Sequence, residues 1–310
     1  PSRHFDRYYP NSVTPPRIGR SGDSADHPMT RGAIAGFRTE EIEGAEMMKA
    51  RAAYFACVDF LDEMLGDFLA VLERDGLLDN TVIVYTSDHG EMAGEHGLFW
   101  KNTWHEAAAR VPLIISTPAH RRGELTAQEI TTPTSLADLF PTLCGLTATP
   151  LATDLDGIDL SPAVRGEACP DLDDRPGVIT ESLLPRWGTG TEFRMIRNER
   201  YKYVVFRDCE ALAFDLQDDP DEQIDLAHQA TGDAAAELAA LRTAVLADFS
   251  FDEAATRRKV QQAKLEKQFP ARVACRTPNQ ILRGDGALVE ADGALYEGDT
   301  ISENFASDFS

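Results

Sequence analysis

The sequence predicts an α/β fold in which a mainly parallel sheet is followed by a smaller subdomain with an antiparallel sheet. Two β-branched runs without charges, at 81–86 and 111–116, are typical of strands that are covered on both faces, as in parallel sheets. Residues 40–74 precede the first run and have helical periodicity. Between 175 and 216, short strand-like runs instead follow one another through tight turns, which favours an antiparallel sheet.

The long predicted helix carries one apolar stripe, and Gly76 is placed to end it. The stripe consists of Phe55, Val58, Leu61, Leu65, Phe68 and Leu72. Further helices are expected at 136–143, 233–249 and 253–268. The first 38 residues are rich in Pro, Arg, Ser and Gly, which predicts a long surface loop.

We expect three parts along the chain. Residues 1–150 form the larger α/β domain, 151–250 form a smaller α+β subdomain, and 251–310 form a helix with a turn-rich tail. Within the tail, residues 285–290 resemble residues 292–297, which predicts hairpin-like packing.

Composition excludes some classes of function. The 310 residues include 30 Lys plus Arg against 52 Asp plus Glu, a net charge of −22. This balance argues against nucleic acid and anionic membrane surfaces as partners. No run approaches the roughly 18 apolar residues of a membrane span. Five cysteines without a CxxC pair argue against a zinc ribbon. Their odd number favours a reducing compartment such as the cytoplasm, but the compartment stays open. Whether the protein forms a homo-oligomer also stays open.

The most informative residues follow the first predicted strand. Asp88 stands where that strand ends, and ligand sites in open α/β sheets lie beyond the carboxyl ends of strands. His89 places an imidazole beside this carboxylate, which makes a suitable pair of metal ligands. The alternative is a turn that only caps the strand, with Gly90 allowing the sharp bend.

Lys101 lies thirteen residues beyond Asp88, among Leu, Phe and Trp side chains. Partial desolvation of its amine would require an anionic partner, whereas a solvated surface lysine is the alternative. Trp100 and Trp104 flank it and favour an aromatic core over a pocket lining. Glu106 is spaced to pair with Arg110 across one helical turn.

Two histidines have open interpretations. His105 either contacts a substrate or caps a helix, and the capping role is favoured. His96 is either a hydrogen-bonding residue of the loop or a ligand, and the first is favoured.

Together these motifs resemble the second half of the type I sulfatases, which belong to the alkaline phosphatase superfamily. The resemblance rests on DNTVIVYTSDHGE at 79–91, Lys101 and RVPLI at 110–114. It continues through PTL at 141–143, DGIDL at 156–160 (with Asp159 where the family has Ser), RNERYKY at 197–203, FDL at 214–216 and DPDE at 219–222. The tail after about residue 250 has no counterpart.

The resemblance implies the second, incomplete half of an alkaline phosphatase-like α/β/α sandwich with a smaller antiparallel-sheet subdomain. It implies that Asp88 and His89 are metal ligands, His89 standing where some members carry Asn, and that Lys101 binds the sulfate oxygens in the transition state. The implied metal is a divalent ion, usually calcium and sometimes manganese or magnesium. The implied substrate is a small-molecule sulfate monoester.

The sequence departs from the family at the nucleophile. Sulfatases use a formylglycine made from the Cys of a Cys-x-Pro-Ser-Arg motif, which this sequence lacks. Pro1-Ser2-Arg3 is not the end of that motif, because no small-apolar helix follows it. We therefore expect the nucleophile, further metal ligands and a substrate-binding His upstream of residue 1, and an inactive fragment without them.

Other functions stay open. A phosphonate monoester or phosphodiester hydrolase of the same superfamily would share Asp88, His89 and Lys101. A non-catalytic sulfatase-like binding module would explain the absent nucleophile motif. A two-metal phosphatase fits less well, because no second Asp-His pair stands at a strand end. For a catalytic site, Asp88 and His89 should point the same way, with the Lys101 amine in reach of one anion.

Overall fold

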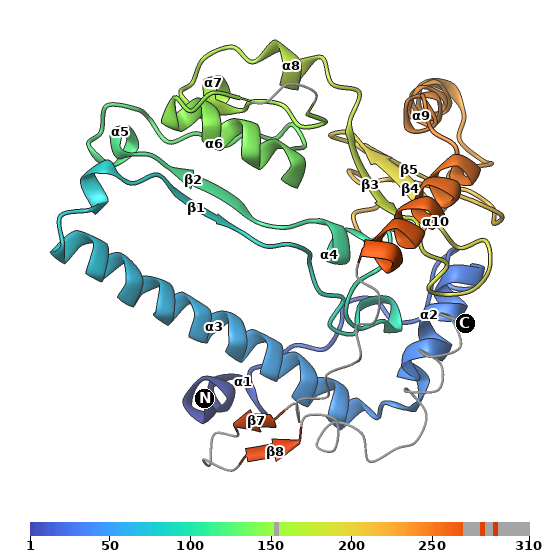
Figure 1. Cartoon of the computed structure of the whole chain (residues 1–310). Coiled ribbons are helices and arrows are strands. Elements are labelled where there is room, and N and C mark those ends of the chain that lie inside the picture. The colour runs from blue at the N-terminus through green and yellow to red at the C-terminus, as the bar shows by residue number, and fades with distance from the viewer. Residues whose placement is uncertain (152–154, 269–279, 283–287, 291–310) are drawn as a thin grey trace. The chain divides into compact units, whose positions relative to one another are not determined.

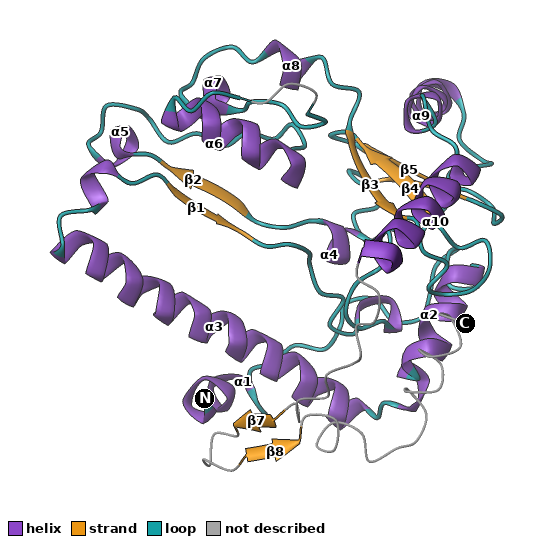
Figure 2. Ribbon diagram, in the orientation of Figure 1, coloured by secondary structure: helices purple, strands orange, loops and turns teal. Residues whose placement is uncertain are grey.

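The computed structural model describes residues 1–151, 155–268, 280–282 and 288–290 of a mixed α/β chain (Figures 1 and 2). The chain divides into two compact units, Pro1–Ala254 and Ala255–Ser310. The predicted boundary near residue 150 stays a prediction. In the described part of the chain, no helix has both the length and the apolar character that crossing a membrane requires.

The first unit begins with the elements that surround the candidate site. In chain order these are α1 (Ser2–Tyr8), α2 (Pro28–Phe37), the 3₁₀ turn Thr39–Glu41, α3 (Gly44–Arg74), the 3₁₀ turn Leu78–Asn80, β1 (Ile83–Thr86), the 3₁₀ turn Glu95–Gly97, α4 (Glu106–Ala109), β2 (Leu113–Ser116) and α5 (Pro118–Arg121). They are followed by the 3₁₀ turn Leu136–Asp138, α6 (Leu139–Thr147), α7 (Ser161–Val164), α8 (Pro170–Asp173), β3 (Val178–Ser182), β4 (Phe193–Arg197), β5 (Tyr201–Phe206), β6 (Leu212–Asp215) and α9 (Gly232–Val245). The helix α10 (Phe251–Gln268) and the antiparallel strands β7 (Gln280–Leu282) and β8 (Leu288–Glu290) complete the described chain.

The prediction of a mainly parallel sheet is wrong for the strands described. β1 pairs with β2 antiparallel, with Ile83 opposite Ser116 and Thr86 opposite Leu113. Figure 1 shows this ribbon running between α3 on one side and α6 on the other. The predicted coverage on both faces is not found in this chain either, because every residue of β1 is only partly buried and Ile114 of β2 is 60% exposed. A β-branched run does not fix strand direction. The connection between β1 and β2 carries the candidate site.

The loop predicted for residues 1–38 contains two helices. α2 begins at Pro28, because a proline in the first turn of a helix loses no hydrogen bond. The His27 ring caps this helix by accepting a hydrogen bond from the Met29 backbone nitrogen at 3.3 Å. The prolines at 10, 15 and 16 lie outside helices, as their geometry requires.

The long helix α3 confirms the predicted helix, and Gly76 follows its end with φ +67°. The helix is anchored to α1, where the His4 ring contacts Asp59 at 2.7 Å. Its apolar stripe is largely uncovered, and Leu61 and Phe68 are 50% and 56% exposed. An uncovered apolar stripe on a helix of 31 residues is a surface available for packing.

The predicted antiparallel sheet is confirmed, with strand order β3-β4-β5-β6. It is covered on both faces, and every residue of β5 is buried. One face packs against α9 through Leu238, Leu241 and Val245. The opposite face packs against Met29 of α2 and against Trp104. This sheet therefore supports the chain segment that follows Lys101.

The helices predicted at 136–143, 233–249 and 253–268 are present, with shifted ends, as the Leu136–Asp138 turn with α6, as α9 and as α10. The predicted hairpin between 285–290 and 292–297 lies mostly outside the described residues. Four of the five cysteines are described, and all four have free thiols.

Candidate active site

The structure brings Asp88, His89 and Lys101 together beyond the end of β1. The Lys101 Nζ lies 2.6 Å from His89 Nε2. The Asp88 Oδ2 lies 3.4 Å from the same nitrogen. His89 Nδ1 lies 2.8 Å from the Gly90 carbonyl oxygen, to which it donates, so that Nε2 is the acceptor. A carboxylate, an imidazole lone pair and an ammonium group thus meet at one point.

These three groups are open to solvent. The Asp88 side chain is 82% exposed and that of His89 35%. Lys101 is also exposed, so the predicted desolvation of its amine among neighbouring apolar residues is not found in this chain. Its negative and positive charges would let the site hold a cation and an anion side by side.

The role of Asp88 and His89 as metal ligands stays a prediction. A carboxylate oxygen and an unprotonated imidazole nitrogen are ordinary ligands, and the hydrogen bond from Nδ1 to a carbonyl oxygen orients such an imidazole. Within the residues that the structure describes, no group of three or more His, Cys, Asp or Glu side chains could hold a metal ion. Two ligands are too few for a stable site, so this pair would need further ligands to hold a metal ion.

Gly90 is required by close packing against α4. A Cβ at this position would lie 2.1 Å from the Ala107 carbonyl oxygen, and the Gly90 nitrogen donates to the Ala108 carbonyl at 2.8 Å. These contacts tie the end of β1 to α4. The glycine of the Asp-His-Gly motif thus fixes the backbone that presents His89.

Sequence reasoning missed two residues that shape the loop before Lys101. The Glu91 carboxylate accepts hydrogen bonds from the Ala93 and Trp100 nitrogens at 2.9 and 2.6 Å. Arg51 of α3 is 6% exposed and donates to the Ala93 carbonyl at 2.6 Å. Arg51 also pairs with Glu95 at 3.1 Å. The only sequence signal for Arg51 is a charged residue amid the alanines of an otherwise ordinary helix.

A buried ion cluster anchors the segment just beyond Lys101. Lys202 of β5 is fully buried, and its Nζ contacts Glu106 and Glu222 at 2.7 Å each. It also donates to the Trp104 carbonyl at 2.8 Å. Arg197 binds the other oxygen of Glu106 at 3.1 Å. The predicted pair between Glu106 and Arg110 is therefore wrong, because Glu106 faces the small sheet.

Burial and charge act in opposite directions in this cluster. Burial raises the pKa of Glu222, and Lys202 only partly offsets that rise. Burial also acts to raise the pKa of Glu106, but Lys202 and Arg197 outweigh it and lower the pKa. Lys202 therefore favours the charged form of both carboxylates.

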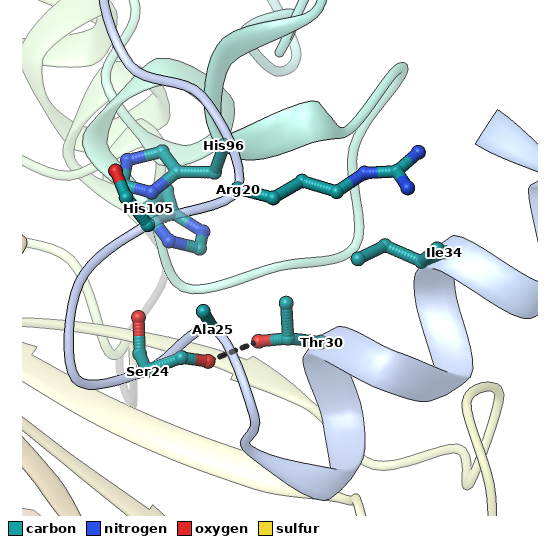
Figure 3. A pocket seen from close by; sticks show the side chains of 8 residues that line it. Arg20, Ser24, Ala25, Thr30, Ile34, His96 and His105 are labelled. Atoms are coloured by element: carbon teal, nitrogen blue, oxygen red, sulfur yellow. Dashed lines mark hydrogen bonds between the residues drawn. The ribbon is translucent and has the colours of Figure 1, made fainter. Parts of the chain in front are cut away.

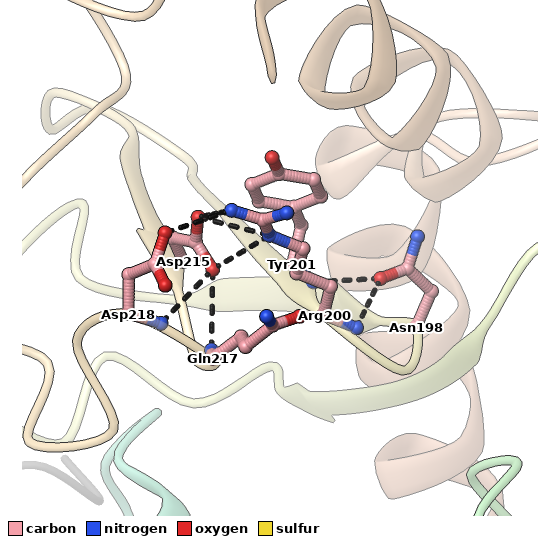
Figure 4. Close-up of polar contacts among 6 residues, drawn as sticks. All are labelled: Asn198, Arg200, Tyr201, Asp215, Gln217 and Asp218. Carbon is pink, nitrogen blue, oxygen red and sulfur yellow. Dashed lines mark hydrogen bonds and ion pairs between the residues drawn. The ribbon is translucent and has the colours of Figure 1, made fainter. Parts of the chain in front are cut away.

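The turn after β4 is fixed by a second ion pair. Arg200 contacts both oxygens of Asp215 at 3.0 Å and reaches Asp218 at 2.8 Å (Figure 4). The Asn198 side chain accepts from the Tyr201 nitrogen at 2.7 Å. The RNERYKY motif thus has a structural role, because it positions the strand that carries Lys202.

The two histidines with open interpretations line one small cavity of about 10 Å³, together with Arg20, Ser24 and Thr30 (Figure 3). His105 is 1% exposed and forms the N-cap of α4. Its Nδ1 lies 2.8 Å from the Thr103 hydroxyl, and its ring centroid lies 4.0 Å from that of His96.

Among the described residues, His105 Nε2 is a buried nitrogen without a hydrogen-bond partner. Burial lowers the pKa of His105 well below its ordinary value, and burial also lowers the pKa of His96. Both rings are therefore neutral near pH 7. A contact of His105 with substrate stays a prediction.

Trp104 and Trp100 differ in environment. Trp104 is fully buried against the small sheet, which confirms the prediction of an aromatic core residue. For Trp100 that prediction is wrong, because its side chain is 51% exposed. Its backbone φ is +62°, a conformation that sequence reasoning did not anticipate.

Two family models match the chain. The first, described as "Sulfatase", matches residues 3–149, and the second, described as "N-sulphoglucosamine sulphohydrolase, C-terminal", matches residues 94–241. The chain belongs to the sulfatase family, within the alkaline phosphatase superfamily.

Similar proteins agree with this assignment. The chain is 32% identical to arylsulfatase K of Gallus gallus over 195 residues, covering 61% of this chain and 36% of that protein. It is 33% identical to choline-sulfatase of Rhizobium meliloti (strain 1021) over 202 residues, covering 63% of this chain and 36% of that protein. Its structure resembles a phosphonate monoester hydrolase of Agrobacterium radiobacter with a TM-score of 0.55 and 26% identity, covering 81% of this chain and 47% of that one. The match thus spans about a third of the length of these curated relatives.

Proposed function

We propose that the protein hydrolyses a sulfate monoester at a site containing Asp88, His89 and Lys101. The observation that carries this proposal is the meeting of these three side chains at His89 Nε2, 2.6 Å from the lysine amine and 3.4 Å from the carboxylate. Membership of the sulfatase family supports the reaction class.

In this proposal Lys101 binds the oxygens of the sulfate group. An ammonium group carries three donors and a full positive charge, so it stabilises negative charge that develops on those oxygens. In the structure the amine donates to His89 Nε2 instead. The lone pair on His89 Nε2 cannot accept a hydrogen bond from Lys101 and coordinate a metal ion at the same time. A metal ion on this nitrogen would therefore release the Lys101 amine to bind the anion.

Asp88 and His89 would hold a divalent ion, which would polarise the ester and neutralise charge. Calcium is the ion that we propose first, with manganese and magnesium as alternatives. Calcium prefers oxygen ligands, whereas imidazole nitrogen is more usual for transition metals. Because His89 offers a nitrogen ligand, the activity with calcium and the activity with manganese are the two values to compare.

The remaining catalytic groups are proposed to lie on chain outside these 310 residues, including a formylglycine nucleophile. Two observations support this. The apolar stripe of α3 is largely exposed to solvent, and Phe68 is 56% exposed. Further elements of the protein could pack against this face. The curated relatives are also much longer than the matched segment.

The test uses the natural-length protein. Hydrolysis of 4-nitrophenyl sulfate is measured after removal of metal with EDTA and again after addition of Ca²⁺ or Mn²⁺. Activity should be lost with EDTA and restored by one of the two ions. Lys101→Ala should lower kcat/KM by about 100-fold to 1,000-fold, because it removes a charged donor from the transition state. The matched control is Lys264→Ala, since Lys264 is an exposed lysine of α10.

A second candidate function is phosphonate monoester hydrolysis. The likeness to the Agrobacterium radiobacter enzyme at 26% identity favours it. Parallel assays with 4-nitrophenyl phenylphosphonate separate the two, since the preferred ester is the one with the higher kcat/KM. If neither ester is hydrolysed with Ca²⁺ or with Mn²⁺, the proposal is wrong and a non-catalytic module becomes the better explanation.

A further inference from the structure

Lys101 stands between two residues with a left-handed backbone. Trp100 has φ +62°, and Asn102 has φ +68°. Asparagine adopts this region more readily than most residues, whereas a bulky aromatic residue there is an outlier. A strained conformation of this kind persists only where surrounding contacts hold it. The direction in which the backbone presents Lys101 therefore depends on the groups that bind its two neighbours.

Glu91 holds the residue before the lysine. One oxygen of its carboxylate, Oε1, accepts from the Trp100 nitrogen at 2.6 Å and from the Ala93 nitrogen at 2.9 Å. The Met92 nitrogen also donates to the Trp100 carbonyl at 2.9 Å. Glu91 directly follows the Asp-His-Gly motif, so it ties the end of the loop before Lys101 to the segment that carries the other groups of the candidate site.

Trp187 holds the residue after the lysine. It lies between β3 and β4, and its indole nitrogen donates to the Asn102 carbonyl at 2.7 Å. The indole is itself anchored on α2, where its centroid lies 4.7 Å from that of Phe37. Gly36 of the same helix leaves room for the ring, since a Cβ there would lie 3.0 Å from it. The donor that binds Asn102 is therefore held by an element outside the loop.

We propose that Glu91 and Trp187 are positioning residues, which clamp the backbone on both sides of Lys101 and so fix the place of its amine. The inference rests on the proposed function, because it takes Lys101 to bind the sulfate oxygens. Lys101 is exposed, and among the described residues His89 is the one side chain that its amine contacts. When the amine leaves His89 for the anion, its place is set by the backbone, so the two clamps determine how well it meets the transition state.

The test measures kcat and KM of the natural-length protein for 4-nitrophenyl sulfate, with the metal ion that restores activity. Trp187→Phe keeps an aromatic ring against α2 and removes the indole donor. It should lower kcat about tenfold and change KM less than about twofold, because a displaced ammonium group loses more in the transition state than in the ground state. Glu91→Ala should have the same effect, whereas the exposed control Glu167→Ala should leave both constants unchanged.

Two comparisons separate positioning from a general structural role. Glu91→Gln keeps an oxygen that can accept from both backbone nitrogens, so it should recover most of the kcat lost in Glu91→Ala. In a Lys101→Ala background, Trp187→Phe and Glu91→Ala should each lower kcat by less than about twofold, because the lysine through which they act is already absent. A general structural role would lower kcat by the same factor in both backgrounds.

The clamps can also be measured without hydrolysis. Amide hydrogen exchange reports how often a backbone segment opens. In the peptide that contains residues 100–102, exchange should be about tenfold faster in Trp187→Phe and in Glu91→Ala than in the wild type. Exchange in α9, which is distant in the sequence from this loop, should stay as in the wild type.

Unchanged kcat in Trp187→Phe and Glu91→Ala, equal losses with and without Lys101, or a Glu91→Gln as slow as Glu91→Ala would overturn the inference. Failure of the proposed function gives a different result. A wild type that hydrolyses no ester refutes the reaction, and the exchange measurement then decides the clamps: faster exchange in both variants supports them, and unchanged exchange refutes them. A sulfatase whose kcat is the same in both variants refutes the clamps alone.

Discussion

Replacing Lys202 with methionine should destabilise the protein strongly, because it leaves two carboxylates without their shared cation. Lys202 is fully buried, and its amine contacts Glu106 and Glu222 at 2.7 Å each. Removing one partner of a buried ion pair costs about 3–5 kcal/mol. The Glu222 side chain is 3% exposed, so water cannot replace the lost contact.

The loss should grow with pH. Burial raises the pKa of Glu222 even with Lys202 present, and without the lysine that pKa rises further. A carboxyl whose folded pKa lies above its unfolded value contributes most to stability below the unfolded pKa, and that contribution is lost as pH rises toward the folded pKa. Lys202→Met should therefore be closer to the wild type at pH 5 than at pH 8, with a change of up to about 1.4 kcal/mol per pH unit in between.

Urea unfolding followed by circular dichroism at pH 5 and pH 8 measures this. With an m-value of about 3 kcal/mol/M, the midpoint at pH 8 should fall by about 1 M or more. The double variant Lys202→Met/Glu222→Gln removes one uncompensated charge and should recover a substantial part of the loss. A loss below about 1 kcal/mol, or one independent of pH, would refute the reasoning.

Two further predictions concern the backbone and the histidines near the site. Gly90→Ala should destabilise the protein by about 1–3 kcal/mol, because its Cβ would lie 2.1 Å from the Ala107 carbonyl oxygen. The control Gly66→Ala on α3 has nothing within 4 Å of the added Cβ and should be neutral or stabilising. Thermal unfolding compares the two variants. The unfolding free energy should fall as pH drops from 7 to 5, because burial lowers the pKa of His105 and His96 and the unfolded chain therefore binds more protons than the folded one. His105→Leu should flatten this dependence on pH. An unchanged pH profile in that variant would count against the role of His105.

The sequence predicted the features that depend on local pattern. The periodicity of α3, the four short strands joined by turns and the Asp-His-Gly turn are all set by neighbouring residues, and each appears where it was expected. The direction of β1 against β2 could not be read in this way, since a β-branched composition suits parallel and antiparallel strands alike. The two N-terminal helices were hidden by prolines, because a proline at the start of a helix has the same composition signal as one in a loop.

The three residues predicted for the candidate site lie close together in the sequence, and the structure brings them together. Asp88 and His89 are neighbours, and the distance of thirteen residues to Lys101 was recognised through a family motif. The contacts of Glu106 were misassigned, because its partners Arg197 and Lys202 lie about ninety residues away, on strands of the small sheet. No pattern of residue types indicates the exposure of Trp100 or its positive φ.

The ion cluster gives a physical reason for motifs far from the candidate ligands. Lys202 belongs to the RNERYKY motif and Glu222 to DPDE, and neither contacts Asp88 or His89 among the described contacts. Both instead hold the Trp104–Glu106 segment, through the Trp104 carbonyl, the Glu106 carboxylate and the Glu106 backbone nitrogen, which donates to Glu222 at 2.7 Å. Because Trp104 lies three residues beyond Lys101, the small sheet fixes one end of the loop that carries the lysine, while Arg51 and Glu91 fix the other. A loop tethered at both ends can hold a charged side chain in place even though that side chain is itself exposed, so the antiparallel sheet is part of the candidate site's support rather than a separate module.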